Sequence, residues 1–260
     1  LLEELIKAAG REGVSNFPIH IKIDTGMHRL GFAPEEIPAL VDRLHRQSAV
    51  IPRSVFSHLV GSDAERFDLF TRRQIETFEN ASAELQAGFS HKILRHICNT
   101  AGIERYPGAQ FDMVRLGIGL YGIDPFTNKI LHNVGTLKTT ILQIHDVPAD
   151  ETVGYSRKGI LTRNSRIAAI PIGYADGLNR HLGNGNAYCL VNGQKAPYVG
   201  NICMDVCMID VTDIDCKEGD KVIIFGDELP VTILADKLNT IPYEILTSVS
   251  NRVKRIYYQN

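Results

Sequence analysis

The sequence predicts an α/β half followed by an all-β half. Up to about Leu131, short apolar runs alternate with longer helical stretches; beyond it, strand-like runs separated by Gly, Asn, Asp and Pro dominate. The 260 residues are 44% hydrophobic and 22% charged, which is typical of globular chains with packed cores. This length suits one large domain or two ordinary ones. We place the domains at residues 1–134 and 135–260.

The first half is expected to form a parallel sheet. Apolar residues at helical spacing from Leu1 to Ala9 indicate an opening helix. A proline begins the next helix, where its missing N–H costs no hydrogen bond, and Gly88 can end the longest one. Strands that alternate with helices imply right-handed βαβ units. The predicted strands span residues 19–24, 54–59, 93–98 and 113–120, and the two further helices span residues 34–46 and 67–87.

The second half is predicted to be a β domain. Strand-like runs there are separated by turn residues, and two short segments have helical spacing. The predicted strands span residues 137–147, 166–172, 187–191, 202–211, 221–225 and 252–257, and the two short helices span residues 232–238 and 243–249.

Charge and hydropathy exclude some classes of partner. The formal net charge is −2, and no long basic run offers a footprint for nucleic acid. No stretch approaches the roughly 20 apolar residues that cross a bilayer, and the charged opening segment differs from a signal peptide. A cytoplasmic location is therefore expected. Because the chain opens within a helix and its first residue is Leu1, we expect a portion of a longer protein.

Four of the five cysteines lie close enough in sequence to raise the question of a zinc site. Cys203 and Cys207 fall in a period-two run, and four strand residues span about 13 Å. Thiolates that bind one zinc ion at about 2.3 Å cannot be so far apart. We therefore expect no metal, and free thiols in a reducing compartment.

Polar residues collect at the carboxyl ends of the predicted strands. In parallel α/β proteins the active site lies at that edge, although a single strand-end His or Arg is often structural. Nearby glycines could let backbone N–H groups approach a phosphate, so an anionic cofactor is expected. The polar residues are Lys22, Asp24, Ser57, His58, His96, Cys98, Asn99 and Arg115.

Residues 117–122 (GIGLYG) also match the G-x-G-x-x-G fingerprint of nicotinamide-dependent dehydrogenases. The fingerprint requires a helix to open at its third glycine, whereas Asp124 and Pro125 follow two residues later. No acidic residue at a strand end lies clearly 20 positions on. The dehydrogenase hypothesis is therefore weak.

Five segments together resemble alanine racemase, the pyridoxal phosphate enzyme family that interconverts L- and D-alanine. Their order and approximate spacing agree with the family over essentially the whole chain. The segments are residues 22–31 (KIDTGMHRLG), 113–122 (MVRLGIGLYG), 170–177 (IPIGYADG), 199–205 (VGNICMD) and 239–244 (NTIPYE).

The resemblance implies a (β/α)8 TIM-type barrel followed by a C-terminal β domain, with this chain holding the second half of the barrel. The family's cofactor lysine lies on the first barrel strand, in a motif of the type Val-Lys-Ala-Asn-Ala-Tyr-Gly-His. Nothing in the 260 residues matches that motif. We therefore expect a C-terminal portion of an alanine racemase that is inactive alone.

The resemblance assigns residues to the cofactor. Arg115 would face the pyridine nitrogen, and a guanidinium cannot accept a proton there, so the ring would be a weaker electron sink than in enzymes with an acidic partner. The phosphate would be held by the hydroxyls of Thr100 and Tyr243 and by the backbone of Gly117 and Ile118.

Substrate-binding roles follow from the same resemblance. Arg29 would bond the phenolic oxygen of the cofactor and help hold the substrate carboxylate, to which the backbone N–H of Met204 would contribute. Lys22 matches a lysine that is carbamylated in several relatives, where the new anion orients that arginine. Tyr174, Arg180 and Asp205 would support the site.

Tyr155 matches the family's second catalytic base. A phenol is a poor base at neutral pH, so its anion has to be stabilised, and His58, bonded to Tyr155 and backed by Arg115, would supply part of that. In the family, Tyr155, Met204 and Asp205 reach the site from the other subunit, which implies a head-to-tail homodimer.

The expected reaction is two-base racemisation that supplies D-alanine for peptidoglycan. Tyr155 would remove the Cα proton of L-alanine, and the cofactor lysine would return a proton on the opposite face. Two alternatives stay open: a racemase for another small amino acid such as serine, and a noncatalytic dimerisation or fusion domain.

Overall fold

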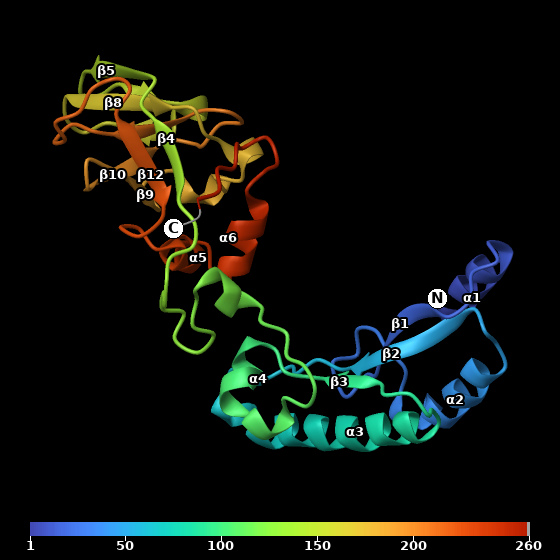
Figure 1. The fold of residues 1–260 in the computed structure, drawn as a ribbon. Helices are drawn as coiled ribbons and strands as arrows, with labels where there is room; N and C mark the ends of the chain where they lie inside the picture. Colours follow the sequence, from blue (N-terminus) through green and yellow to red (C-terminus); the bar gives the residue numbers. More distant parts are fainter. Residues whose placement is uncertain (259–260) are drawn as a thin grey trace. The chain divides into compact units, whose positions relative to one another are not determined.

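The computed structural model describes residues 1–258 and divides into two compact units (Figure 1). The first unit comprises residues 1–120 and 124–127, and the second comprises residues 121–123 and the chain from residue 128 onward. Within the described residues, no helix is long and apolar enough to cross a membrane.

The first unit is a three-stranded parallel sheet with helices between its strands (Figure 1). The strands are β1 (Phe17–Lys22), β2 (Val50–Phe56) and β3 (Leu94–His96), and they pair in the order β1-β2-β3. The helices are α1 (Leu2–Arg11), α2 (Ile37–His45), α3 (Asp68–Ala87) and α4 (Thr100–Arg105), with 3-10 turns at Pro34–Glu36, Glu65–Phe67, Pro107–Ala109 and Ile118–Tyr121.

Alternation along β1 separates a core side from a polar side. Ile19, Ile21 and Ile23 are buried, whereas His20 and Lys22 between them are not. The buried residues join one cluster with apolar positions of the helices, so α2 and α3 cover a face of the sheet (Figure 1). The helical members of that cluster are Ile6, Ala9, Ile37, Leu40, Leu44, Phe78, Ala81 and Leu85.

The predicted fourth strand, residues 113–120, is wrong. The backbone N–H groups of Gly117 and Gly119 donate to the Thr100 hydroxyl oxygen at 2.9 and 3.3 Å, so they make no ladder with a neighbouring strand. A 3-10 turn forms at Ile118–Tyr121 instead. The other predicted helices and strands of this half are confirmed within a few residues, and Gly88 follows α3 with φ −75°, without a left-handed turn.

The second unit contains a seven-stranded sheet of antiparallel pairs in the order β4-β12-β9-β10-β11-β8-β5, with β6 and β7 paired separately. The strands are β4 (Leu137–Thr140), β5 (Gln143–Val147), β6 (Thr152–Val153), β7 (Gly159–Ile160), β8 (Ser165–Ile170), β9 (Tyr188–Val191), β10 (Gln194–Val199), β11 (Cys207–Asp210) and β12 (Lys221–Phe225). The helices are α5 (Val231–Lys237) and α6 (Pro242–Ser248), with 3-10 turns at Tyr155–Arg157, Tyr174–Asp176 and Arg180–Leu182.

Three predicted strands of this half need correction. Residues 137–147 form two strands, because Ile141 donates to Asp220 while the adjacent Leu142 donates to Ala169 on β8. In residues 202–211 only β11 is a strand. Residues 252–257 form none, and the Arg255 guanidinium donates to the carbonyl oxygens of Val249, Ser250 and Val253.

All five cysteines are free thiols. Cys98, Cys189, Cys207 and Cys216 are buried, and burial raises the pKa of Cys98 to about 11 and that of Cys189 to about 12. Cys203 is half-buried. No group of three or more His, Cys, Asp or Glu side chains in residues 1–258 has an arrangement that could hold a metal ion.

Candidate functional site

The register of the parallel sheet brings the strand ends of the first unit together. Lys22 pairs with Phe56, and Phe56 with His96, so the segments that leave these strands begin at one edge. The first unit contains the predicted residues Lys22, Arg29, His58, Thr100, Arg115, Gly117 and Ile118; the second contains Tyr155, Tyr174, Arg180, Met204, Asp205 and Tyr243.

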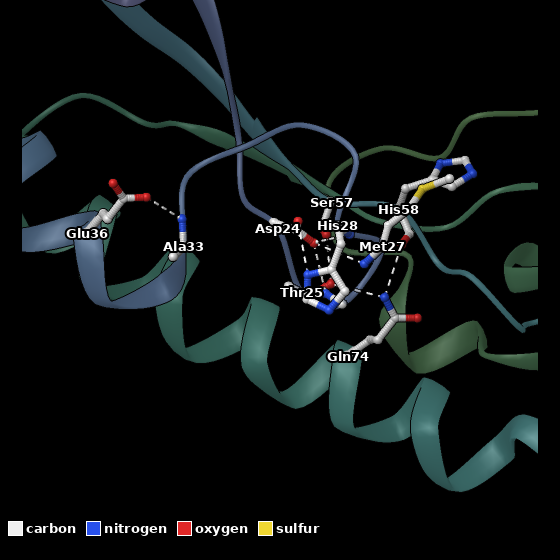
Figure 2. Close-up of polar contacts among 10 residues, drawn as sticks. Asp24, Thr25, Met27, His28, Ala33, Glu36, Ser57, His58 and Gln74 are labelled. Carbon is white, nitrogen blue, oxygen red and sulfur yellow. Dashed lines mark hydrogen bonds and ion pairs between the residues drawn. The ribbon is translucent and has the colours of Figure 1, made fainter.

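The loop after β1 is folded around one carboxylate (Figure 2). The Oδ1 atom of Asp24 accepts hydrogen bonds from the backbone N–H groups of Gly26, Met27 and His28 at 2.9, 2.9 and 3.1 Å. Burial would raise the pKa of Asp24, but these three donors lower it below its usual value. Gly26 has a φ of +126°, which favours glycine, so the loop turns tightly before Arg29.

Arg115 is fixed by backbone carbonyls at the ends of β2 and β3. Its Nη2 donates to the oxygens of Ser57 at 2.6 Å and Ile97 at 3.2 Å, and its Nη1 donates to the oxygen of His96 at 3.3 Å and to the His96 Nδ1. These four contacts use the Nη hydrogens. The Nε–H finds no partner among the described residues, so one donor of a rigidly held guanidinium is left for a ligand.

His96 behind Arg115 is held neutral. Burial, then the charge of Arg115 and then His20, lower the pKa of His96 to about 4. Because a guanidinium only donates, the His96 Nδ1 accepts from it, and the ring proton lies on Nε2, which donates to Ser54 Oγ at 3.2 Å. The Ser54 hydroxyl in turn donates to the His20 Nδ1.

The sheet edge carries an excess of positive charge. Burial, then Arg29, lower the pKa of Lys22, and Arg115 lowers it further while Asp24 opposes. Burial, then Arg115, Arg29 and Lys22, lower the pKa of His58. A bound anion would offset the positive charge that lowers these two pKa values, so the edge has the electrostatics of an anion site.

Thr100 and a glycine-rich turn meet beside this edge. The Thr100 hydroxyl oxygen accepts from Gly117 and Gly119, and the intervening Ile118 N–H has no partner within the part of the chain that the structure describes. A Cβ on Gly119 would lie 2.8 Å from the Thr100 methyl carbon, so only glycine lets the turn approach so closely. Hydroxyl and N–H groups that converge like this suit phosphate oxygens.

The second unit has its own cluster of predicted residues around a pocket of about 520 Å³. Tyr243 lies outside this lining, on α6, with its ring centroid 6.1 Å from that of Tyr121; burial raises the pKa of Tyr243. The residues that line the pocket are Tyr155, Tyr174, Arg180, Ile202, Cys203, Met204, Asp205 and Val206.

Tyr155 projects from a strained turn. Gly154, Ser156 and Arg157 have φ values of 80°, 57° and 53°, which non-glycine residues rarely adopt. The Asn201 amide donates to the Tyr155 carbonyl oxygen at 3.2 Å and secures the turn. The Tyr155 side chain is 72% exposed, so the turn presents its phenol rather than packing it.

Hydrogen bonds to the carbonyl oxygens of Cys203 and Met204 hold the segment around Met204 in place. The oxygens of Cys203 and Met204 accept from the N–H groups of Tyr174 and Ala175 at 3.0 and 3.1 Å, whereas the Met204 N–H has no partner among residues 1–258. That N–H is therefore available to a carboxylate, which suits the role that the sequence resemblance implies.

Arg252 is a site-supporting residue that sequence reasoning missed. Its guanidinium bridges two carboxylates, with Nε 2.7 Å from Asp176 Oδ1 and Nη2 2.6 Å from Asp205 Oδ1. It thereby links the 3-10 turn that contains Tyr174 to the loop that contains Met204. No local pattern around Arg252 marks this role, because its partners lie 76 and 47 residues away.

Gln74 on α3 was missed as well, although a signal existed. It follows Phe70 by four residues and precedes Phe78 by four, so a polar residue stands in the apolar stripe of the helix. A buried polar side chain of this kind needs hydrogen-bond partners. Those of Gln74 are Val60 and, as Figure 2 shows, Thr25 and His58.

Known proteins match both units. The profile described as "Alanine racemase, N-terminal domain" matches residues 2–125, and that described as "Alanine racemase, C-terminal domain" matches residues 134–257. Alanine racemase 2 of Caldanaerobacter subterraneus subsp. tengcongensis is 41% identical over 266 residues, which cover 98% of this chain and 68% of that protein. The chain thus spans about two thirds of the length of that relative.

Solved structures agree. The alanine racemase of Clostridium difficile 630 has a TM-score of 0.90 at 33% identity, over 99% of this chain and 68% of that one. The alanine racemase of Bartonella henselae with covalently bound pyridoxal phosphate has a TM-score of 0.83 at 33% identity, over 98% and 70% of the two chains.

These matches define the class of the protein, which is an amino-acid racemase of a family that depends on pyridoxal phosphate. The chain belongs to the alanine racemase family. The resemblance seen in the sequence motifs is thereby confirmed.

Proposed function

We propose that the protein interconverts L- and D-alanine with pyridoxal phosphate as its cofactor. The observation that supports this most directly is the basic sheet edge, where, after burial, Arg115, Arg29 and Lys22 lower the pKa of His58 and Arg29 and Arg115 lower that of Lys22. The phosphate, phenolate and carboxylate groups of cofactor and substrate are the anions that such an edge would stabilise. When bound, the cofactor withdraws electrons from the substrate Cα and so acidifies its proton.

The residues of the first unit fit this cofactor. Arg115 would donate its Nε–H to the pyridine nitrogen. Because a guanidinium cannot accept a hydrogen bond from a protonated ring nitrogen, that nitrogen would stay unprotonated. The Thr100 hydroxyl and the Ile118 N–H would hold the phosphate, to which the family resemblance adds the backbone of Gly117 and the Tyr243 hydroxyl. Arg29 would bond the phenolic oxygen.

The substrate and its proton would be handled by two groups of residues. Arg29 and the Met204 N–H would hold the alanine carboxylate. Tyr155 would take the Cα proton of L-alanine, with His58 stabilising the phenolate, and would return a proton to the same face in the reverse direction. We place the base for the opposite face, a lysine, in the part of the relatives' length that these 260 residues do not match.

Lys22 would act as a carbamate. Its depressed pKa increases the share of free amine, which is the form whose nitrogen lone pair attacks the carbon of CO2; a nitrogen proton then leaves to solvent. The carbamate anion would lie among Arg29 and Arg115 and orient Arg29.

The proposed assembly is a head-to-tail homodimer with residues 1–134 as part of a (β/α)8 barrel and residues 135–260 as the β domain. In it, Tyr155, Met204 and Asp205 would serve the partner's site, with Tyr174 and Arg180 supporting the pocket. The proposal includes a role in supplying D-alanine for peptidoglycan. It also includes a cytoplasmic location, which five free thiols support because they favour a reducing compartment.

The test is Tyr155→Phe in the full-length protein, with Cα hydrogen exchange followed in deuterated water from both enantiomers. We expect loss of proton abstraction from L-alanine with cofactor binding retained. Wild-type racemisation by the variant in both directions would overturn the role of Tyr155. A comparison of the kinetics with serine and with alanine distinguishes an alanine racemase from a racemase of another small amino acid. If the wild type showed neither turnover nor cofactor binding, a noncatalytic domain would be favoured.

A further inference from the structure

Gln74 is buried between the loop that carries Arg29 and the strand end that carries His58. It lies on α3 with 1% of its surface exposed, and its amide makes three hydrogen bonds, of which Figure 2 shows those to Thr25 and His58. The Oε1 atom accepts from the Val60 N–H at 3.0 Å, and Nε2 donates to the His58 carbonyl oxygen at 3.2 Å and the Thr25 hydroxyl at 3.3 Å.

The chemistry of the partners fixes the orientation of this amide. A backbone N–H can only donate and a carbonyl oxygen can only accept, so Oε1 must face Val60 and Nε2 must face His58. Both Nε2 hydrogens are then used, the second by Thr25. If the amide were flipped, Nε2 would face the Val60 N–H and Oε1 would face the His58 carbonyl oxygen, and neither pair could form a hydrogen bond. The amide therefore has a single orientation.

The hydrogen-bond network of Gln74 also reaches Arg115, through Thr25 and Ser57. The Thr25 and Ser57 hydroxyls are 2.8 Å apart, and the Ser57 carbonyl oxygen accepts from Arg115 at 2.6 Å. Gly26, next to Thr25, would place a Cβ 2.9 Å from the Phe70 ring, so the loop rests directly on α3. The helix therefore sets the distance of the Arg29 loop from the sheet edge.

We propose that Gln74 is a positioning residue that couples the loop carrying Arg29 to the strand end carrying His58. Without it, the loop and the strand end would keep their own local bonds but lose their fixed spacing. The inference rests on the proposed function for its catalytic consequence, because Arg29 is assigned to the substrate carboxylate and His58 to the catalytic tyrosine. The coupling itself can be measured without catalysis.

The chain contains a matched control on the same helix. Gln86 also donates twice, to the carbonyl oxygens of Phe89 at 3.2 Å and His91 at 2.9 Å, and accepts from the Ile93 N–H at 2.8 Å. Its partners belong to the turn that leads into the amino end of β3, away from the carboxyl ends of the strands. Removal of the Gln86 amide thus deletes the same number of side-chain hydrogen bonds without touching the proposed coupling.

The first experiment compares amide hydrogen exchange in this chain for Gln74→Ala, Gln86→Ala and the milder Thr25→Val. Gln74→Ala is expected to accelerate exchange at the Val60 and Met27 amides by about tenfold, and Gln86→Ala only near Ile93. Thr25→Val, which leaves the core of α3 intact, should loosen the loop but not Val60. Equal exchange at Met27 in Gln74→Ala and Gln86→Ala would overturn the coupling.

The second experiment measures kinetics in the full-length protein. We expect Gln74→Ala to raise the KM for alanine by about tenfold and to lower kcat, and Gln86→Ala to leave KM unchanged even where it lowers Tm equally. Similar KM values in Gln74→Ala and Gln86→Ala would mean that Gln74 contributes to stability only and does not position the site. A wild type that does not racemise alanine would refute the proposed function, while the exchange data would still decide the coupling.

Discussion

The ring Nδ1 of His96 accepts a hydrogen bond from the guanidinium of Arg115, so an uncharged imidazole supports a permanently charged group. A protonated ring would offer a donor where an acceptor is needed and would repel the guanidinium. The neutral state of His96 is therefore a condition for the geometry of Arg115.

We predict that His96 makes the first unit less stable in acid. Its pKa is about 4 in the folded protein, below the usual value of about 6.5, so the unfolded state binds more protons between these limits. The free energy of unfolding should fall as pH decreases through this window, by at most about 3 kcal/mol at pH 4.

The variant His96→Asn keeps an acceptor for Arg115 and should abolish this dependence. Urea-dependent exchange of the β2 and β3 amides between pH 4 and 8 measures it. His145→Asn, at an exposed position of β5, is the control. An unchanged slope in His96→Asn would show that the histidine is not the titrating group.

Removal of neighbouring positive charge should raise the pKa of His58. After burial and Arg115, Arg29 and then Lys22 lower it. We expect Arg29→Met to raise the His58 pKa more than Lys22→Met does, as followed by NMR titration of the imidazole Cε1 proton. Lys92→Met removes an exposed charge that pairs with Asp112 and should change nothing. The reverse order of effects would contradict the described cluster.

Gly173→Ala should disrupt the pocket of the second unit. Its Cβ would overlap the carbonyl oxygens of Cys203 and Met204, so the segment that presents the Met204 N–H would have to move. We expect a loss of about 2–4 kcal/mol in the free energy of unfolding. Gly135→Ala, which meets nothing within 4 Å, should stay within about 0.5 kcal/mol in the same denaturation experiment. A stable Gly173→Ala would mean that the loop adapts.

Arg252→Ala should release the loop at Asp205. The lost bridge to Asp176 and Asp205 is half-exposed, so we expect a small loss of stability. The Ala175 amide, which donates to the Met204 carbonyl oxygen, should exchange faster. Arg163→Ala breaks an isolated pair with Asp213 and should leave exchange at Ala175 unchanged. Equal exchange at Ala175 in both variants would argue against a supporting role for Arg252.

Local pattern predicted the elements that local forces determine. The alternation of Ile19, Ile21 and Ile23 predicted β1, and α3 appeared from its apolar spacing. The alternation in residues 113–120 predicted a strand as well, but Thr100 takes the N–H groups of Gly117 and Gly119. A partner so far along the chain leaves no trace in the local pattern.

The candidate site divides in the same way. Motifs identified the residues that would touch cofactor and substrate, such as Arg115 and Tyr155. They did not identify Gln74 or Arg252, because these act through partners chosen by the tertiary fold: a loop hydroxyl and backbone groups for Gln74, two carboxylates for Arg252. Such residues become visible only when burial and hydrogen-bond partners are known.

Cys203 provides a native thiol in the pocket of the second unit to which a fluorescent label can be attached. The other four thiols are buried, whereas Cys203 is half-buried in the wall that it shares with Tyr155 and Met204. Access governs the rate of alkylation, so a maleimide fluorophore should modify Cys203 before the others. The native sequence can therefore be labelled next to Tyr155 without mutation, and occupancy of that pocket becomes an optical signal.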